Sequence, residues 1–315
     1  MQLPEQKKAS KPASQFAIRP IEEAILRAVH TYHYLTNEQI VRLKYSKGSL
    51  SHVRNLTHRL TEAGFLQRVL LPDARMGKPK SIYTLGGRGI AYLRQLGLEV
   101  VVKYRPSEER EKENNHHFLA HTLAVNDFLI AASLLPKVAP HITLYDLRHE
   151  RVLRHENPPR VTIKVGDKRE RTQSVAVIPD GWLDFRISDP GNTPDQACIL
   201  LELDRGTESI KPWKYKVQTL LAYEKRPDTN TPSAYERQFG TTSLTIAVAT
   251  TTNEKRLADL VRWTEQELEA LNAKHNADLF RFSLLPQEID PTTLFLAPSW
   301  HRPFDASLLP LLEGN

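Results

Sequence analysis

Three carboxylates stand at the ends of two apolar segments. Asp180 precedes the first segment, and Glu202 and Asp204 close the second. The stretch between the segments contains two prolines and a glycine, so it predicts a turn that joins them into an antiparallel hairpin. With the hairpin centred near Asn192, Asp180 lies opposite Asp204, and Glu202 occupies the same face one diagonal step away.

Carboxylates this close together repel one another unless a cation lies between them. A site made of oxygen ligands favours Mg²⁺ or Mn²⁺, so Asp180, Glu202 and Asp204 are the predicted metal ligands. The structural alternative is that Asp180 caps a turn and the other two carboxylates form ion pairs with nearby basic residues.

The acidic motif resembles that of the PD-(D/E)XK nuclease superfamily at Asp180 and Glu202. The resemblance implies a restriction-endonuclease-like mixed sheet in which these two residues hold a divalent metal. Asp204 stands where the motif has a lysine that helps to activate water. The resemblance implies that this lysine would come from the following helix, as Lys211, Lys214 or Lys216, with Lys214 or Lys211 assisting the attacking water. Two alternatives follow, a Mg-dependent DNA endonuclease or nickase, and a nuclease-like domain that does not complete catalysis.

Two other patterns belong to the same part of the chain. His117 and His121 lie one helical turn apart, but no third ligand is evident nearby, so we expect them to orient a phosphate or to pack against the hairpin. Residues 211–216 alternate basic and aromatic types, which suits contact with a nucleic-acid backbone. The packing of an amphipathic helix is the alternative explanation of that segment.

A polar surface suited to DNA is predicted near the N-terminus. Residues 49–62 place apolar side chains at helical spacing, which leaves the rest of the helix surface polar. No acidic residue lies between Lys47 and Thr61, so this surface does not repel phosphate. The exposed side chains are of types that contact base edges and phosphates: Ser49, Ser51, His52, Arg54, Asn55, His58 and Arg59.

A basic loop follows between two predicted strands, 65–71 and 81–85. Its cations Arg75, Lys78 and Lys80 suit contact with phosphates or with the minor groove. Three helices followed by a hairpin are typical of a winged helix-turn-helix, so we expect double-stranded DNA as the partner. A winged helix used for protein contacts is the alternative.

The segment pattern predicts an α/β (α+β) chain with two domains. Residues 20–102 form the winged helix-turn-helix, and 115–290 form the restriction-endonuclease-like mixed-sheet domain. Residues 1–19 are predicted to be a disordered lead-in and 103–114 a linker, while 291–315 form a tail packed on the body. The predicted elements of the second domain are helices at 115–135, 208–225 and 254–272 and strands at 142–148, 161–165, 174–178, 182–188, 197–203, 243–250 and 279–285.

Charge and composition agree with this division. Residues 1–105 carry 18 Lys and Arg against 7 Asp and Glu, whereas residues 106–315 carry 25 against 30. Residues 1–105 are therefore basic and the rest of the chain is mildly acidic. This difference indicates that residues 1–105 bind a polyanion. The single cysteine, the polar N-terminus and the lack of a run of about 18 apolar residues predict a cytoplasmic protein without a membrane partner.

Four stretches, in the expected order, are similar to the replication-relaxation family of bacterial plasmid and mobile-element proteins. They are the predicted winged helix through Tyr83-Thr84-Leu85, residues 121–128, Pro179-Asp180 and residues 202–208. The resemblance implies a replication-relaxation or mobilisation accessory, or a regulator, with plasmid replication or mobilisation proteins as further partners. Whether the protein forms a homodimer is left open.

Overall fold

The computed structural model describes residues 16–46, 48–71, 79–100, 111–165, 171–188 and 193–312, with the backbone alone for 111–116. The chain forms two compact units, and the first of them ends at Val100. The mixed α and β architecture predicted from the sequence is confirmed. The predicted lead-in and linker lie mostly outside the described residues.

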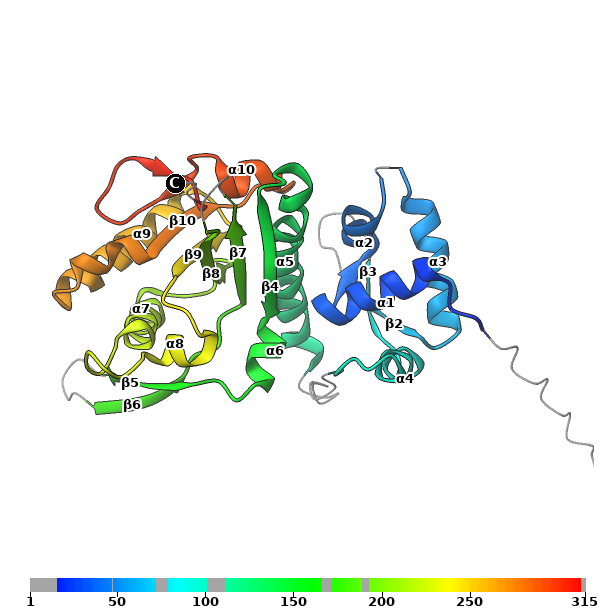
Figure 1. Cartoon of the computed structure of the whole chain (residues 1–315), viewed down its shortest axis with the longest axis horizontal. Helices are drawn as coiled ribbons and strands as arrows, with labels where there is room; N and C mark the ends of the chain where they lie inside the picture. The colour runs from blue at the N-terminus through cyan, green and yellow to red at the C-terminus, as the bar shows by residue number, and fades with distance from the viewer. Residues whose placement is uncertain are drawn as a thin grey trace, which may run out of the picture. The chain divides into compact units, whose positions relative to one another are not determined.

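The first unit contains the predicted three helices and hairpin, followed by a fourth helix (Figure 1). Its elements are α1 (Pro20–Tyr32), β1 (Leu35–Thr36), α2 (Asn37–Lys44), α3 (Leu50–Glu62), β2 (Leu66–Leu71), β3 (Lys80–Leu85) and α4 (Gly87–Gln95). The three strands form a sheet in the order β1-β3-β2, and Leu35 pairs with Tyr83 in antiparallel register. The two-residue strand β1 was not predicted, because it exists only through this long-range pairing.

Helix α2 is fixed at its start and along its inner side. Thr36 accepts a hydrogen bond from the backbone of Gln39, whose side chain accepts one in return from the backbone of Thr36. Asn37 is buried, accepts a hydrogen bond from Thr57 of α3 at 2.9 Å and donates one to Tyr83 of β3 at 3.4 Å. This reciprocal capping and the buried polar link set the angle between α2 and α3.

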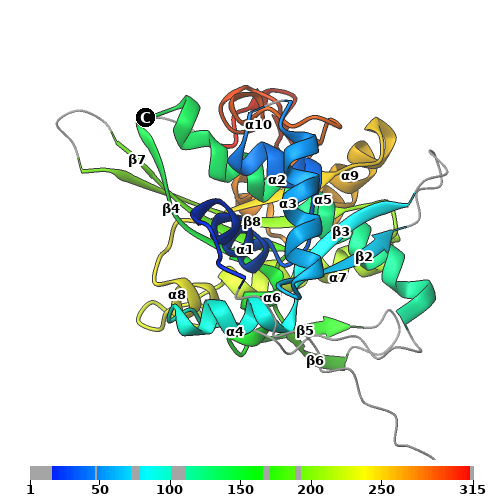
Figure 2. The same ribbon diagram turned by 90° about the vertical axis from the view of Figure 1, so that its right-hand side faces the viewer.

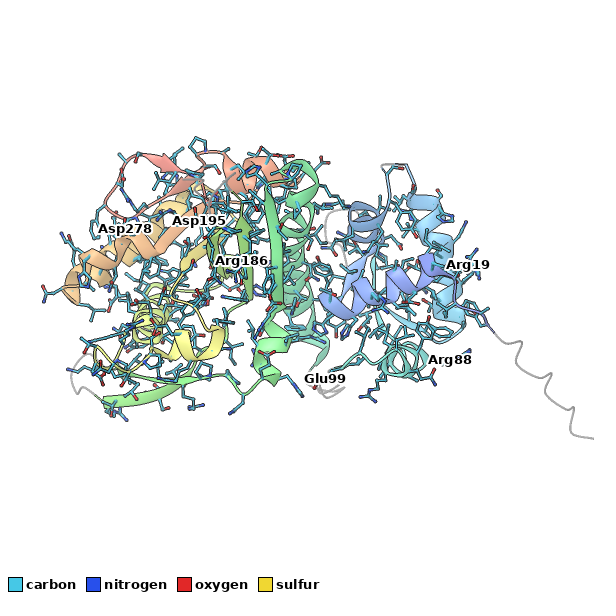
Figure 3. The ribbon with its side chains drawn as sticks, viewed as in Figure 1. Arg19, Arg88, Glu99, Arg186, Asp195 and Asp278 are labelled. Atoms are coloured by element: carbon cyan, nitrogen blue, oxygen red, sulfur yellow. The ribbon has the colours of Figure 1, made fainter. Side chains whose placement is uncertain are left out.

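Helix α4 begins very close to the start of β2. A Cβ atom added at Gly89 would lie 2.2 Å from the carbonyl oxygen of Phe65, and one added at Gly86 would lie 2.5 Å from that of Gly64. Arg88, labelled in Figure 3, places its guanidinium 4.6 Å from the ring centre of Phe65. The two glycines therefore allow the backbone of α4 to approach the start of β2 more closely than any residue with a side chain would allow.

The second unit is built on a seven-stranded sheet in the order β12-β11-β10-β9-β8-β7-β4, with a separate hairpin β5-β6. Strands β8, β9 and β10 are parallel, and the other pairings of the large sheet are antiparallel. The strands are β4 (Ile142–His149), β5 (Arg160–Val165), β6 (Arg171–Ala176), β7 (Gly181–Ile187), β8 (Asp195–Asp204), β9 (Thr245–Thr250), β10 (Phe280–Leu284), β11 (Trp300–His301) and β12 (Leu308–Leu309). The helices are α5 (Glu111–Val138), α6 (Glu150–His155), α7 (Ile210–Glu224), α8 (Ala234–Phe239), α9 (Glu254–Ala270) and α10 (Pro291–Leu296), and a 3₁₀ helix spans Lys274–Leu279.

Helices cover both faces of this sheet. Helices α7 and α9 pack on one face through Trp213, Val217 and Leu260, all of them buried. On the opposite face Phe128 of α5 and Phe295 of α10 stack edge to face at 5.5 Å. The short elements α6, α8, α10, β11 and β12 were not predicted, since each is too brief to show a periodic pattern.

Helix α5 accounts for the most apolar stretch in the described residues. Residues 117–138 are long and apolar enough to cross a membrane, but 61% of the tested stretch is buried inside the protein. The helix contacts β4, β7, β8 and α10. We therefore assign it as the central helix of the second unit.

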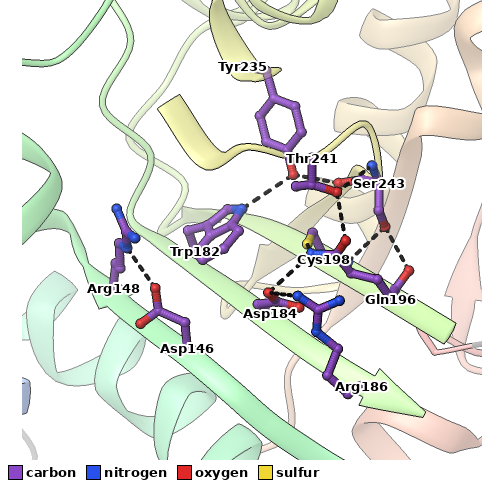
Figure 4. A network of polar contacts seen from close by, with 10 residues as sticks. All are labelled: Asp146, Arg148, Trp182, Asp184, Arg186, Gln196, Cys198, Tyr235, Thr241 and Ser243. Atoms are coloured by element: carbon purple, nitrogen blue, oxygen red, sulfur yellow. Dashed lines mark hydrogen bonds and ion pairs between the residues drawn. The ribbon is translucent and has the colours of Figure 1, made fainter. Parts of the chain in front are cut away.

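A polar network fixes the loop before β9 to the first half of β8 (Figure 4). The Ser243 hydroxyl accepts a hydrogen bond from the backbone of Cys198 and donates one to the carbonyl of Gln196, both at 3.0 Å. Trp182 donates to the hydroxyl of Tyr235 at 3.3 Å. Cys198 is buried, and burial raises the pKa of its thiol to about 11, so this cysteine is a packing residue and not a nucleophile.

Candidate functional site

The acidic cluster lies where β7 begins and β8 ends. Gly181 pairs with Leu201, and the backbone N–H of Asp180 donates to the carbonyl of Leu201. The hairpin is therefore two residues out of the predicted register, so Glu202, and not Asp204, follows as the residue opposite Asp180. The register is set by the described strands, in which Gly181 pairs with Leu201 and Ile187 with Asp195.

Asp180 pairs with a histidine from the central helix. His121 Nε2 lies 2.9 Å from Asp180 Oδ1, while Oδ2 accepts the backbone N–H of Leu203 at 2.7 Å. Burial lowers the pKa of His121, but the hydrogen bond and the charge of Asp180 outweigh burial and raise it above the usual value. Burial raises the pKa of Asp180, yet the same histidine, Lys216 and the Leu203 N–H together lower it.

Glu202 faces α7 and pairs with Lys216. Lys216 Nζ lies 2.9 Å from Glu202 Oε2 and 3.0 Å from Glu208 Oε1. Burial, with a contribution from the charge of Asp180, raises the pKa of Glu202 to about 7 although Lys216 opposes the shift. Burial lowers the pKa of Lys216, but the surrounding carboxylates raise it above its ordinary value, so this amine remains charged.

Asp204 is bound on both oxygens by α9. Arg256 donates to Asp204 Oδ2 at 2.8 Å and to Oδ1 at 2.6 Å, and the hydroxyl of Thr250 and the N–H of Gly206 also donate to Oδ2. Burial raises the pKa of Asp204, but these donors outweigh it and lower the pKa below the usual range. A bidentate arginine of this kind fixes the carboxylate in place.

These groups surround a cavity of about 200 Å³. Its walls include His121, Asp180, Glu202, Asp204 and Lys216. Each of the three predicted ligands thus has a basic partner inside the protein, from α5, α7 and α9 respectively. Across the described ranges, no group of three or more His, Cys, Asp or Glu side chains is arranged to hold a metal ion. In this arrangement each carboxylate lies within hydrogen-bond distance of a basic side chain of the protein, so Mg²⁺ or Mn²⁺ would have to compete with these partners.

The two predicted catalytic lysines do not enter the cavity. Lys214 Nζ lies 3.7 Å from Glu267 of α9, and Lys211 lies over the ring of Tyr215 at 6.0 Å. Lys216 enters the cavity instead, because it lies one helical turn after the buried Trp213, which lines the same cavity. The sequence offered no signal for Arg256, which lies 52 residues beyond Asp204 and reaches it only through the β9-α9 connection.

The predicted polar surface of α3 is exposed, and Figures 1 and 2 show the helix in two views. Ser51, His52, Arg54, Asn55, His58 and Arg59 are exposed, and Ser49 is half-buried at the start of the helix. The apolar residues Val53, Leu56 and Leu60 are buried beneath them, as the helical spacing predicted.

The arginines of this surface differ in their contacts. Arg59 lies 3.1 Å from Glu22, a fully buried residue of α1, and its guanidinium lies 5.4 Å from the ring of Phe16. Arg54 approaches Glu38 only at 3.8 Å, and both side chains are more than half exposed. Arg59 therefore supports the fold of the unit, whereas Arg54 is held weakly.

The predicted basic loop is represented by Lys80 alone. Lys80 begins β3 and is exposed. Arg75 and Lys78 lie outside the described residues.

The chain belongs to the replication-relaxation family, whose model matches residues 26–234, about two thirds of the chain. The match begins within α1 and ends at α8, so it includes α3 and the acidic cavity. It ties the protein to replication, and a plasmid or another mobile element is the setting that the family suggests. The comparisons matched no curated protein and no solved structure.

Proposed function

We propose that the protein binds double-stranded DNA through its first unit, a winged helix-turn-helix, in the replication of a plasmid or mobile element. The observation that carries the proposal is the exposed surface of α3, which includes His52, Arg54 and Asn55, while the helix itself carries no acidic residue before Glu62. Arginine and asparagine are the residues that most often read base edges, and a helix packed on a three-stranded sheet can enter the major groove.

Two further observations support this proposal. The N-terminal 105 residues have an excess of 11 basic residues, which favours a polyanionic partner. The polar link between α2 and α3 through Asn37 and Thr57 holds the proposed recognition helix at a defined angle. We also propose that the protein acts in the cytoplasm, that it can form a homodimer, and that it contacts other replication or mobilisation proteins.

Gel-shift titration of the full chain on duplex DNA at low salt tests the proposal. The double variant Arg54→Ala/Asn55→Ala should bind at least tenfold more weakly, because each good base contact contributes about 1–3 kcal/mol. Lys255→Ala, an exposed residue of α9, is the matched surface control and should bind like the wild type. Arg59→Ala is unsuitable, since it also removes the partner of buried Glu22.

We propose that the second unit has a nuclease-like fold and does not cleave DNA. The ion pairs of Asp180, Glu202 and Asp204 support this proposal. In them, basic side chains of the protein occupy the carboxylates that would bind the metal ion in a nuclease.

A Mg-dependent endonuclease or nickase is the second candidate. The shared cavity of Asp180, Glu202 and Lys216 favours it, since these are the residue types of a nuclease motif. Supercoiled plasmid incubated with the protein and Mg²⁺ or Mn²⁺ decides between the two. Nicking by the wild type that is lost in Asp180→Ala would establish the enzyme, and intact plasmid with a retained gel shift would establish the binding protein.

A further inference from the structure

A second cavity is lined by residues of the β5-β6 hairpin and of α7. These elements lie at the lower left of Figure 1. It measures about 370 Å³, within the range of small-ligand pockets. Its walls are apolar and include Ile163, Val175, Val177, Pro212, Tyr215 and Leu220. Glu202 and Lys216 line both cavities, so the apolar one adjoins the acidic cavity through this ion pair.

The elements that form this groove are basic. The described part of the hairpin, 160–165 and 171–178, contains Arg160, Lys164 and Arg171 and no acidic residue. The first two turns of α7 contain three lysines and likewise no acidic residue. Arg171 and Lys211 are exposed, whereas Arg160 is tied to Ser174 by two hydrogen bonds. Lys214 is paired with Glu267, and Lys216 is paired with Glu202 and Glu208. The charge that favours an anionic occupant is therefore that of the exposed Arg171 and Lys211.

The polar atoms of the groove suit a base as well as a phosphate. Gln173 is exposed and lines the cavity, and its amide can both donate and accept hydrogen bonds. Tyr215 presents a ring beside Lys211. The apolar walls and the aromatic ring suit a base, and the amide can form hydrogen bonds with it. Lys211 suits a phosphate. Proteins that bind single-stranded nucleic acids combine aromatic and basic side chains in the same way.

We propose that this groove binds an unpaired nucleotide of a single-stranded DNA segment, with the base between the hairpin and α7 and the phosphates against Lys211 and Arg171. The site goes beyond duplex binding by the first unit, because it lies wholly in the second unit and uses none of the α3 residues. A protein of this kind would hold both duplex and melted DNA during replication.

Fluorescence anisotropy with a labelled 12-nucleotide thymidine strand tests the site in the full chain. Lys211→Glu and Arg171→Glu should each weaken strand binding at least fivefold and leave duplex binding unchanged. Lys255→Glu makes the same charge change on α9 and should have little effect. Thermal unfolding of each variant confirms that it is folded.

A strand of equal length with abasic sites in place of its bases separates base binding from attraction to phosphate. The inference expects the abasic strand to bind at least fivefold more weakly to the wild type. Equal binding of both strands would overturn it, as would unchanged binding by Lys211→Glu and Arg171→Glu.

The Arg54→Ala/Asn55→Ala variant separates this site from the first unit. Strand binding that survives in this variant supports the groove even if the wild type fails to bind duplex DNA. Strand binding that is lost in this variant, and retained in Lys211→Glu, would place the strand on α3 and overturn the inference.

Discussion

At the scale of residues, the acidic cavity is neutralised from within. His121, Lys216 and Arg256 each pair with one carboxylate, and these three basic residues come from three different helices. Because burial and the partners shift the pKa values of Glu202 and Asp204, the free energy of unfolding should depend on pH.

Lys216→Met should destabilise the protein, and more so at alkaline pH. Folding raises the pKa of Glu202 from 4.5 to about 7, so the folded chain holds this proton more tightly and Glu202 lowers stability as the pH rises between these values. Without Lys216 the charged carboxylate has no cation, and the loss at pH 8 should be about 2 kcal/mol. This is less than the 3–5 kcal/mol of fully buried pairs because the lysine side chain is 31% exposed.

Urea unfolding at pH 5.5 and pH 8 measures this effect, with Lys255→Met as the exposed lysine control. A loss of stability that is equal at both pH values would contradict the ionic role assigned to Lys216.

Asp204→Asn should also destabilise the protein, with a pH dependence that falls in a more acidic range. Folding lowers the pKa of Asp204, so its ion pair contributes stability above the unfolded pKa of 3.8 and loses it as the pH falls through the folded value. The difference between variant and wild type should therefore be largest near neutral pH and shrink in acid. Unfolding curves between pH 3 and pH 7 give the result, and a constant difference would speak against the pair with Arg256.

The residue types of the site could be predicted from the sequence, but their partners could not. Asp180 and Glu202 stand out because charged residues end two apolar strands. His121 was noted for its spacing from His117, and its contact with Asp180 arises from the packing of α5 on the sheet. Arg256 belongs to a helix whose amphipathic pattern gives no reason to distinguish one exposed arginine from another.

At the scale of elements, the first unit depends on a backbone contact between α4 and β2. Gly89→Ala should destabilise the protein by about 1–3 kcal/mol, the usual cost of overpacking, because the new methyl group would meet the carbonyl oxygen of Phe65. Gly87→Ala is the matched control, since no atom lies within 4 Å of its added Cβ. Thermal unfolding of both variants tests the contact, and equal stability would show that α4 is not packed this closely.

The longer elements of both units were predicted because each repeats its apolar spacing several times. Helix α3 and strands β2 and β3 begin and end within one residue of the predicted bounds. Strand β1 and the register of the β7-β8 hairpin were not predictable in the same way. The first depends on a partner more than 40 residues away, and the second depends on where a turn begins.

At the scale of the whole molecule, the chain is a member of the replication-relaxation family with two compact units and a strongly uneven charge. We propose that the basic first unit binds duplex DNA and that the second unit does not cleave it. The charge of the first unit predicts that affinity falls steeply with salt, because each phosphate contact contributes about −0.9 to the slope of log K against log salt concentration.

Binding of the full chain to duplex DNA, measured across a range of salt concentrations, tests whether the first unit binds duplex DNA. We expect tight binding at low salt and a steep negative slope of log K against log salt concentration. In Arg54→Ala this slope should be about one unit shallower. Absence of binding at low ionic strength, or an Arg54→Ala variant with the affinity and slope of the wild type, would contradict it.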